Sequence, residues 1–298
     1  DQADFLALFP LKGRGRARLI GTVRGEPAAQ PENMKFDDVS DRAIHSLKLK
    51  VETVNWFSTY RVHHRVSQHF RKGNAFLLGD AAHIHSPVGG QGMNTGIGDA
   101  INLAWKLKWV LAGRAPDALL SSYEPERIAF AQKLVATTDR AFNFVSADGP
   151  LAEIIRTKIF PVIFPAAAHL QAFREFLFRT VSQILINYRG DAFSEGKAGG
   201  VAGGDRLPWI KGSENYASLS QMIWQVHIYG EAKNGIGHWC EENKVPLTIF
   251  RWHPLYGSHG LKQDAVYLMR PDSYVALADA AARPETLENY FASRRLTP

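Results

Sequence analysis

A strand–loop–helix pattern between residues 75 and 112 constrains the fold more than any other feature of the sequence. The apolar run Ala75–Leu78 ends at Gly79-Asp80, and a short continuous run of this kind is typical of a buried strand in a parallel sheet. A glycine-rich loop, Ser86–Gly92, follows, and a helix is predicted from about Asn94 to Ala112. The pattern therefore predicts an α/β arrangement with the loop at the end of a strand.

The residue types in this segment suit a ligand that carries hydroxyl groups and negative charge. Asp80 stands at the strand end, where open α/β sheets bind ligands, and its carboxylate accepts hydrogen bonds from hydroxyls. Gly90 and Gly92 have no side chains, so the backbone can approach a flat ligand closely. The free N–H groups at the start of the helix favour negative charge. On the pattern alone, a structural connection with a capping aspartate is an equal alternative. The Lys and Ser/Thr that a P-loop requires do not follow Gly92.

The predicted helix is apolar on several sides. Ile97, Ile101, Trp105 and Trp109 recur every four residues along one stripe. Other faces carry further apolar residues, namely Leu103, Leu107 and Val110. A helix of this kind is expected to be largely buried, with the two tryptophans in the core rather than on a stacking platform.

The chain is predicted to divide at a glycine-rich stretch. Residues 117–190 are mostly helical in pattern, and residues 191–204 hold five glycines with no aromatic residue after Phe193. The predicted domains are residues 1–195 and a compact α/β domain of residues 196–298. Strands are expected in both domains, at Phe5–Phe9, Arg16–Val23, Leu47–Tyr60, Thr248–Phe250 and Ala265–Leu268.

Composition and charge argue against several classes of function. The 35 basic and 29 acidic residues give a net charge of +6, but the basic residues are scattered, so nucleic-acid binding is not expected. No apolar run is long enough to span a bilayer, so no membrane partner is expected. The single cysteine, Cys240, excludes an intrachain disulfide and a CxxC redox pair, which favours a reducing, cytoplasmic location.

Several histidines suggest a metal site at first sight, namely His63, His64, His69, His83 and His85. A zinc site needs three or four convergent ligands, usually with a supporting carboxylate. The sequence offers no such set in a recognised spacing, so no metal is predicted.

One segment closely resembles a motif of a known family. The class A FAD-dependent aromatic monooxygenases, the para-hydroxybenzoate hydroxylase and phenol hydroxylase family, carry Gly-Asp-Ala-Ala-His, a short spacer with Pro, and Gly-x-Gly-x-Asn before a helix. Here the pattern stands as Gly79-Asp80-Ala81-Ala82-His83, Pro87 and Gly90-Gln91-Gly92-Met93-Asn94, and the helix continues as Asp99–Leu107. Two later stretches, Gly203–Pro208 and Arg270–Ala276, resemble the thioredoxin-like C-terminal domain of the phenol hydroxylase branch. The resemblance therefore reaches over most of the chain.

The resemblance implies a role for each matching residue. Asp80 is expected to bond the ribityl chain of FAD, and Pro87 to lie beside the isoalloxazine ring. The backbone N–H groups of Met93 and Asn94 are expected to face the pyrimidine carbonyl, where a helix N-terminus stabilises the charge of reduced flavin. Three glycines complete the expected cofactor site, namely Gly79, Gly90 and Gly92. His83 matches a family position and needs no metal.

The resemblance also implies an activity and a fold. In this family NAD(P)H reduces FAD, dioxygen gives a flavin hydroperoxide, and one oxygen is transferred to a phenolic or similar aromatic substrate. The implied fold is the C-terminal part of a flavoprotein hydroxylase, with a substrate-domain sheet, the flavin-contacting segment, a helical segment and a thioredoxin-like α/β domain that packs or forms a homodimer. A related halogenase or dehydrogenase, and a non-catalytic scaffold, are the alternatives. No catalytic residue is identified.

One departure from the family pattern stands out. The family begins with Gly-x-Gly-x-x-Gly for the ADP half of FAD, but the nearest candidate here, Gly13-Arg14-Gly15, has Arg18 where the third glycine belongs. The expectation is that the N-terminal ADP-binding part of the same enzyme is missing. We therefore expect residues 1–298 alone to hold FAD weakly or not at all.

Overall fold

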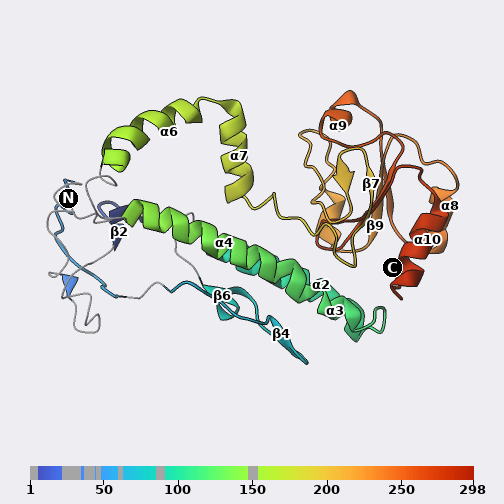
Figure 1. Cartoon of the computed structure of the whole chain (residues 1–298), viewed down its shortest axis with the longest axis horizontal. Helices are drawn as coiled ribbons and strands as arrows, with labels where there is room; N and C mark the ends of the chain where they lie inside the picture. The colour runs from blue at the N-terminus through green and yellow to red at the C-terminus, as the bar shows by residue number, and fades with distance from the viewer. Residues whose placement is uncertain are drawn as a thin grey trace.

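The computed structural model describes residues 6–21, 35–36, 44, 48–59, 63–84, 91–146 and 154–298. Two long helices run side by side through the middle of the molecule: α2 (Gly92–Leu111) and α4 (Tyr123–Ser146) (Figure 1). The short helix α3 (Ala118–Ser121) joins them, α6 (Phe160–Ala168) and α7 (Gln171–Val181) arch over one end, and a mixed domain lies at the other. None of the described helices combines the length and the hydropathy that a membrane span requires.

The strands before α2 form three small antiparallel pairs. The first, β1 (Leu6–Pro10) with β2 (Ala17–Gly21), agrees with the strands predicted there. The others are β3 (Arg65–Val66) with β6 (His83–Ile84) and β4 (Arg71–Lys72) with β5 (Ala75–Phe76). A 3-10 turn, η4 (Gly79–Ala81), lies between β5 and β6.

The prediction of a buried parallel strand at Ala75–Leu78 is wrong. β5 is antiparallel to β4, and Leu77 and Leu78 are each 38% exposed. The reason is a two-residue turn: Gly73 has φ +59°, and Gly73-Asn74 reverses the chain immediately before β5. That turn was visible in the sequence and outweighs the apolar run.

The prediction of sheet over Leu47–Tyr60 is also wrong for the residues that are described. Residues 48–59 contain no strand, and Val51, Val54 and Trp56 are exposed. An alternating pattern forms a strand only when another strand pairs with it. Within the described ranges, no strand pairs with this segment.

Helix α2 is buried on a face that the apolar pattern did not predict. Trp105 and Trp109 are 2% exposed, as expected, but Ile97 and Ile101 are 50% and 40% exposed. The buried residues toward the start of the helix include a polar stripe instead, formed by Thr95, Asp99, Asn102 and Lys106. The polar stripe is stable inside the protein because α4 supplies partners for its charges, as described below.

The C-terminal domain is built on a six-stranded sheet. Its order is β10-β9-β11-β12-β7-β8, with β9 parallel to β10 and antiparallel to β11. Along the chain, a strand–helix–strand unit precedes a hairpin and a final helix, so the domain mixes helices and strands as predicted. The elements are β7 (Glu195–Ala198), β8 (Val201–Ala202), β9 (Gln225–Tyr229), α8 (Ile236–Glu242), β10 (Leu247–Phe250), α9 (Pro254–Ser258), β11 (Val266–Met269), β12 (Val275–Asp279) and α10 (Pro284–Ser293).

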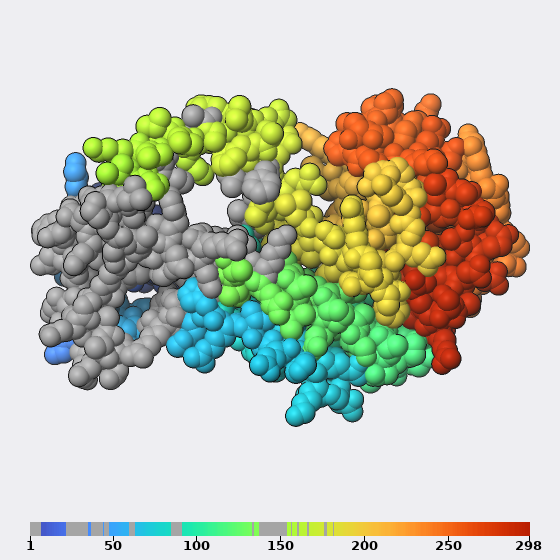
Figure 2. All heavy atoms as spheres, viewed as in Figure 1, coloured from blue at the N-terminus to red at the C-terminus, as the bar shows by residue number. Residues whose placement is uncertain are grey.

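The core of this domain includes the end of α2. The rings of Trp105 and Trp224 meet edge to face at 5.6 Å, and Trp224 meets Phe291 of α10 at 5.3 Å. In Figure 2 the residues from about 185 onward, yellow to red, lie directly against the green residues of α2 to α4. The C-terminal domain and α2 are therefore packed into one core. Cys240 is buried within it, and burial raises the pKa of its thiol to about 12.

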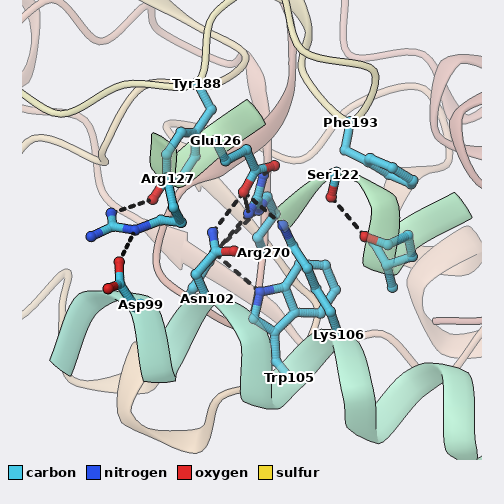
Figure 3. A network of polar contacts seen from close by, with 12 residues as sticks. Asp99, Asn102, Trp105, Lys106, Ser122, Glu126, Arg127, Tyr188, Phe193 and Arg270 are labelled. Carbon is cyan, nitrogen blue, oxygen red and sulfur yellow. Dashed lines mark hydrogen bonds and ion pairs between the residues drawn. The ribbon is translucent and has the colours of Figure 1, made fainter. Parts of the chain in front are cut away.

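A buried ionic cluster connects α2, α4 and the β11–β12 turn (Figure 3). Glu126 of α4 accepts hydrogen bonds from Lys106 Nζ at 2.8 Å and from both Nη atoms of Arg270 at 2.8 Å. Arg270 also pairs with Asp272, which in turn accepts a hydrogen bond from Trp105 Nε1 at 3.0 Å. Because every charge has a partner of opposite sign, the cluster can stay ionised without contact with water.

The cluster predicts a pH dependence of stability that can be isolated by one substitution. Burial by itself would raise the pKa of Glu126, but the charges of Arg270 and Lys106 outweigh it and lower the pKa from 4.5 to about 2. The stabilisation is therefore complete above about pH 4.5 and is lost as the pH falls toward 2. The difference in unfolding free energy between the natural protein and Glu126→Gln should shrink by on the order of 3 kcal/mol over that window. Denaturant melts from pH 6 to pH 2.5 measure it, and a constant difference would contradict it.

Candidate functional site

The turn η4 and the first turns of α2 lie in direct contact. Gly79, the first residue of η4, has φ +55°, a left-handed conformation that favours glycine. A Cβ atom added to Gly96 of α2 would lie 3.2 Å from the Cα of Gly79. The two glycines therefore allow the backbone of the turn to touch the helix.

Asp99 of α2 holds this contact from inside the protein. Its Oδ2 accepts hydrogen bonds from the backbone N–H of Gly79 at 3.0 Å and from His83 Nε2 at 2.8 Å. Its Oδ1 accepts a hydrogen bond from Arg127 Nε at 2.6 Å (Figure 3). Burial opposes ionisation of Asp99, but the hydrogen bond from His83 and the charge of Arg127 prevail and lower its pKa. Asp99 is therefore a carboxylate, and Nε2 of His83 carries the proton.

Asp80 and the start of α2 are the open polar groups of this region. Asp80 is exposed, and among the described residues no partner for its carboxylate is recorded. The N-terminal residue Gln91 gives α2 no side-chain cap, and the first helical hydrogen bond is that of Thr95 N–H to Gln91 O. The N–H groups of Gly92, Met93 and Asn94 thus have no partner in the described part of the chain. An acceptor and several donors are presented at the same end of one helix.

The structure describes five of the seven residues predicted from the sequence, and these lie in two elements that contact each other. Gly79 and Asp80 lie in η4, and Gly92, Met93 and Asn94 form the start of α2. Met93 is 73% exposed. Pro87 and Gly90 lie outside the described residues. The donor and acceptor set fits FAD, because Asp80 can accept from hydroxyl groups and the helix N-terminus can face a negatively charged group.

Sequence reasoning missed the residues that hold the site from behind. Gly96 and Asp99 are three residues apart, so they share one face of α2 and both meet Gly79. That spacing was readable in the sequence. Arg127 gave no such signal, because its partner Asp99 lies 28 residues earlier in the chain. In the described ranges, no group of three or more metal-ligating side chains is placed to hold an ion, and His85 lies outside those ranges.

Comparison with known proteins connects this geometry to a family. Residues 1–138 match the family model described as an FAD binding domain. The chain is 38% identical over 156 residues to pentachlorophenol 4-monooxygenase of Sphingobium chlorophenolicum, covering 51% of this chain and 27% of that protein. It is 47% identical over 248 residues to a flavin-dependent monooxygenase of Mycobacteroides abscessus, covering 80% of this chain and 44% of that protein.

A solved structure shares the fold. The anhydrotetracycline hydroxylase OxyS of Streptomyces rimosus superposes with a TM-score of 0.71 at 22% identity, over 100% of this chain and 59% of that one. The chain is therefore similar to FAD-dependent monooxygenases, one of them named for a phenolic compound, as its flavin motif predicted. It spans less than half the length of either relative, 27% and 44%.

The glycine contact between η4 and α2 yields a direct test. Gly96→Ala places a methyl group 3.2 Å from the backbone of Gly79, so the turn must move away from the helix. We expect a loss of about 1–3 kcal/mol in unfolding free energy. Gly237→Ala in α8 is the matched control, because nothing lies within 4 Å of its added Cβ. That control should stabilise the protein by up to about 1 kcal/mol. Equal effects in thermal melts of the two variants would contradict the contact.

Proposed function

We propose that this protein is an FAD-dependent, NAD(P)H-consuming monooxygenase that hydroxylates a phenolic or similar aromatic compound. The observation that carries the proposal is the position of Asp80. Its carboxylate has no partner among the described residues, and its turn packs against Gly96 and Asp99 of α2, a helix with an open N-terminus. The match of residues 1–138 to an FAD binding domain supports this use of the two groups.

Each residue of the site has a proposed task. Asp80 accepts hydrogen bonds from the hydroxyls of the ribityl chain, and Gly79 gives it the turn that it needs. The N–H groups of Met93 and Asn94 stabilise negative charge at the pyrimidine end of the reduced cofactor. Gly92 keeps the entry to the helix open, and Pro87 and Gly90 complete the loop by their place in the sequence motif. FAD itself supplies the chemistry that activates dioxygen once NAD(P)H has reduced it.

The substrate class rests on the relatives. A monooxygenase named for pentachlorophenol matches 51% of the chain, which supports a phenolic ring as substrate here. The proposed domains are residues 1–195, which hold the cofactor and part of the substrate site, and residues 196–298, which serve packing or a homodimer contact. The structure supports packing, because Trp105 of α2 lies in the core of the C-terminal domain.

The cofactor site is tested by removing the Asp80 carboxylate. In the full-length protein, Asp80→Ala should weaken FAD binding by about 1–3 kcal/mol, because hydroxyls lose a charged acceptor. Asp117→Ala is the control: it removes an exposed aspartate next to α3 at the opposite end of α2, and FAD affinity should not change. Titration of the apoprotein with FAD, followed by flavin fluorescence, measures both. Unchanged affinity in Asp80→Ala would remove Asp80 from the site.

The reaction is tested with labelled dioxygen. The full-length enzyme, supplied with NAD(P)H and a panel of phenols, should give a product that carries one labelled oxygen atom per added hydroxyl group. Product mass spectrometry measures the label. An oxidised product without label would indicate a dehydrogenase, and a halogenated product in the presence of halide would indicate a halogenase. No consumption of NAD(P)H with any phenol would favour a scaffold.

A further inference from the structure

We propose that Asp99 is the positioning residue of the candidate FAD site: it fixes the turn that carries Asp80 against the helix whose N-terminus completes the site, and thereby sets the affinity for FAD. The inference rests on the proposed function, because it assigns a task to a buried residue behind that site. The side chain of Asp99 lies behind the site and is only 1% exposed.

The geometry around Asp99 of α2 joins the segment of residues 79–83 to α4. Its two oxygens receive donors from the backbone of Gly79, from His83 in β6 and from Arg127 in α4, at 3.0, 2.8 and 2.6 Å. The hydrogen bond from Gly79 is the one recorded between η4 and α2 in the described part of the chain. Asp80 follows Gly79 directly in the chain, so this hydrogen bond fixes the position of the Asp80 backbone next to α2.

Arg127 anchors the other side of the carboxylate. Beyond Asp99, it donates to the carbonyl oxygen of Thr95, one turn from the start of α2, and to the hydroxyl of Tyr188, each at 3.2 Å. The ring of Tyr188 lies against the ring of Tyr274, with 4.2 Å between their centres. The guanidinium of Arg270 lies 5.1 Å from the ring centre of Tyr188. The carboxylate is thereby held in a fixed position by the core that α2 shares with the C-terminal domain.

An amide cannot replace this carboxylate. Three N–H donors converge on two oxygen atoms, and an asparagine side chain would direct an NH₂ group at one of these donors. If the oxygen stays with the buried charge of Arg127, Gly79 and His83 lose their acceptor. The turn is then released while the fold around Arg127 keeps part of its hydrogen bonding.

The experiment compares two buried aspartates that are matched in chemistry and differ in contact with the turn. Asp99→Asn alters the acceptor of Gly79. Asp272→Asn alters an aspartate that is also buried and that pairs with an arginine, Arg270, at 2.7 Å. Asp272 contacts Trp105 of α2 but not η4. Hydrogen exchange of the peptide covering residues 77–84 and the affinity for FAD are measured for both variants and for the natural protein.

We expect Asp99→Asn to speed exchange of the Gly79 amide by about ten- to hundredfold and to weaken FAD binding by about tenfold or more. Asp272→Asn should lower the melting temperature but leave both readouts within about twofold of the natural protein. If both variants lose FAD affinity in proportion to their loss of stability, the role of Asp99 is only structural and the inference fails.

A second variant keeps the test open if Asp99→Asn does not fold. Asp99→Glu retains the charge but moves the carboxylate by one methylene, and it should also speed exchange of the Gly79 amide and weaken FAD binding. Natural exchange and affinity in a folded Asp99→Glu would overturn the inference. If the full-length natural protein itself binds no FAD, the proposed function fails instead, and the exchange experiment alone still decides whether Asp99 holds the turn.

Discussion

The rest of the structure depends on the buried pairing of Arg270 with Glu126. Glu126 lies on α4 and Arg270 lies 144 residues later, at the end of β11, yet two hydrogen bonds of 2.8 Å join them without contact with water. Lys106 completes the neutralisation of Glu126, although burial lowers the pKa of Lys106 to about 8. A charge left alone at this depth would cost several kcal/mol, so α2, α4 and the C-terminal domain have to assemble together.

This dependence has a consequence for the candidate site. The open N-terminus of α2 lies several turns from the ionic cluster, on a helix whose other end is fixed in the C-terminal core by Trp105 and Trp109. Asp99 lies between the two ends and holds η4. Gly79, the neighbour of Asp80, contacts α2 at Gly96 and Asp99, on a helix whose other end the C-terminal core holds in place.

Much of the candidate site could be read from the sequence, because its chemistry is local. The segment from Gly79 to Asn94 carries an acceptor, glycines and a helix start in a fixed order. The strands β10 and β11 agree with the predicted runs for a similar reason, since buried β-branched and aromatic residues specify a strand in a compact domain. The residues behind the site were missed because the role of Asp99 depends on its ion pair with Arg127, and only the tertiary structure shows that pair.

The sequence by itself determined the flavin motif, the extent of α2 and the strands β10 and β11, since each follows from residues that are neighbours along the chain. Only the tertiary structure decided which face of α2 is buried. The apolar stripe predicted Ile97 and Ile101 inside, but both are exposed, while Asp99 and Lys106 are buried. The physical reason is that Arg127 and Glu126 of α4 stabilise the charges of Asp99 and Lys106. A local sequence pattern cannot predict that another helix supplies these partners.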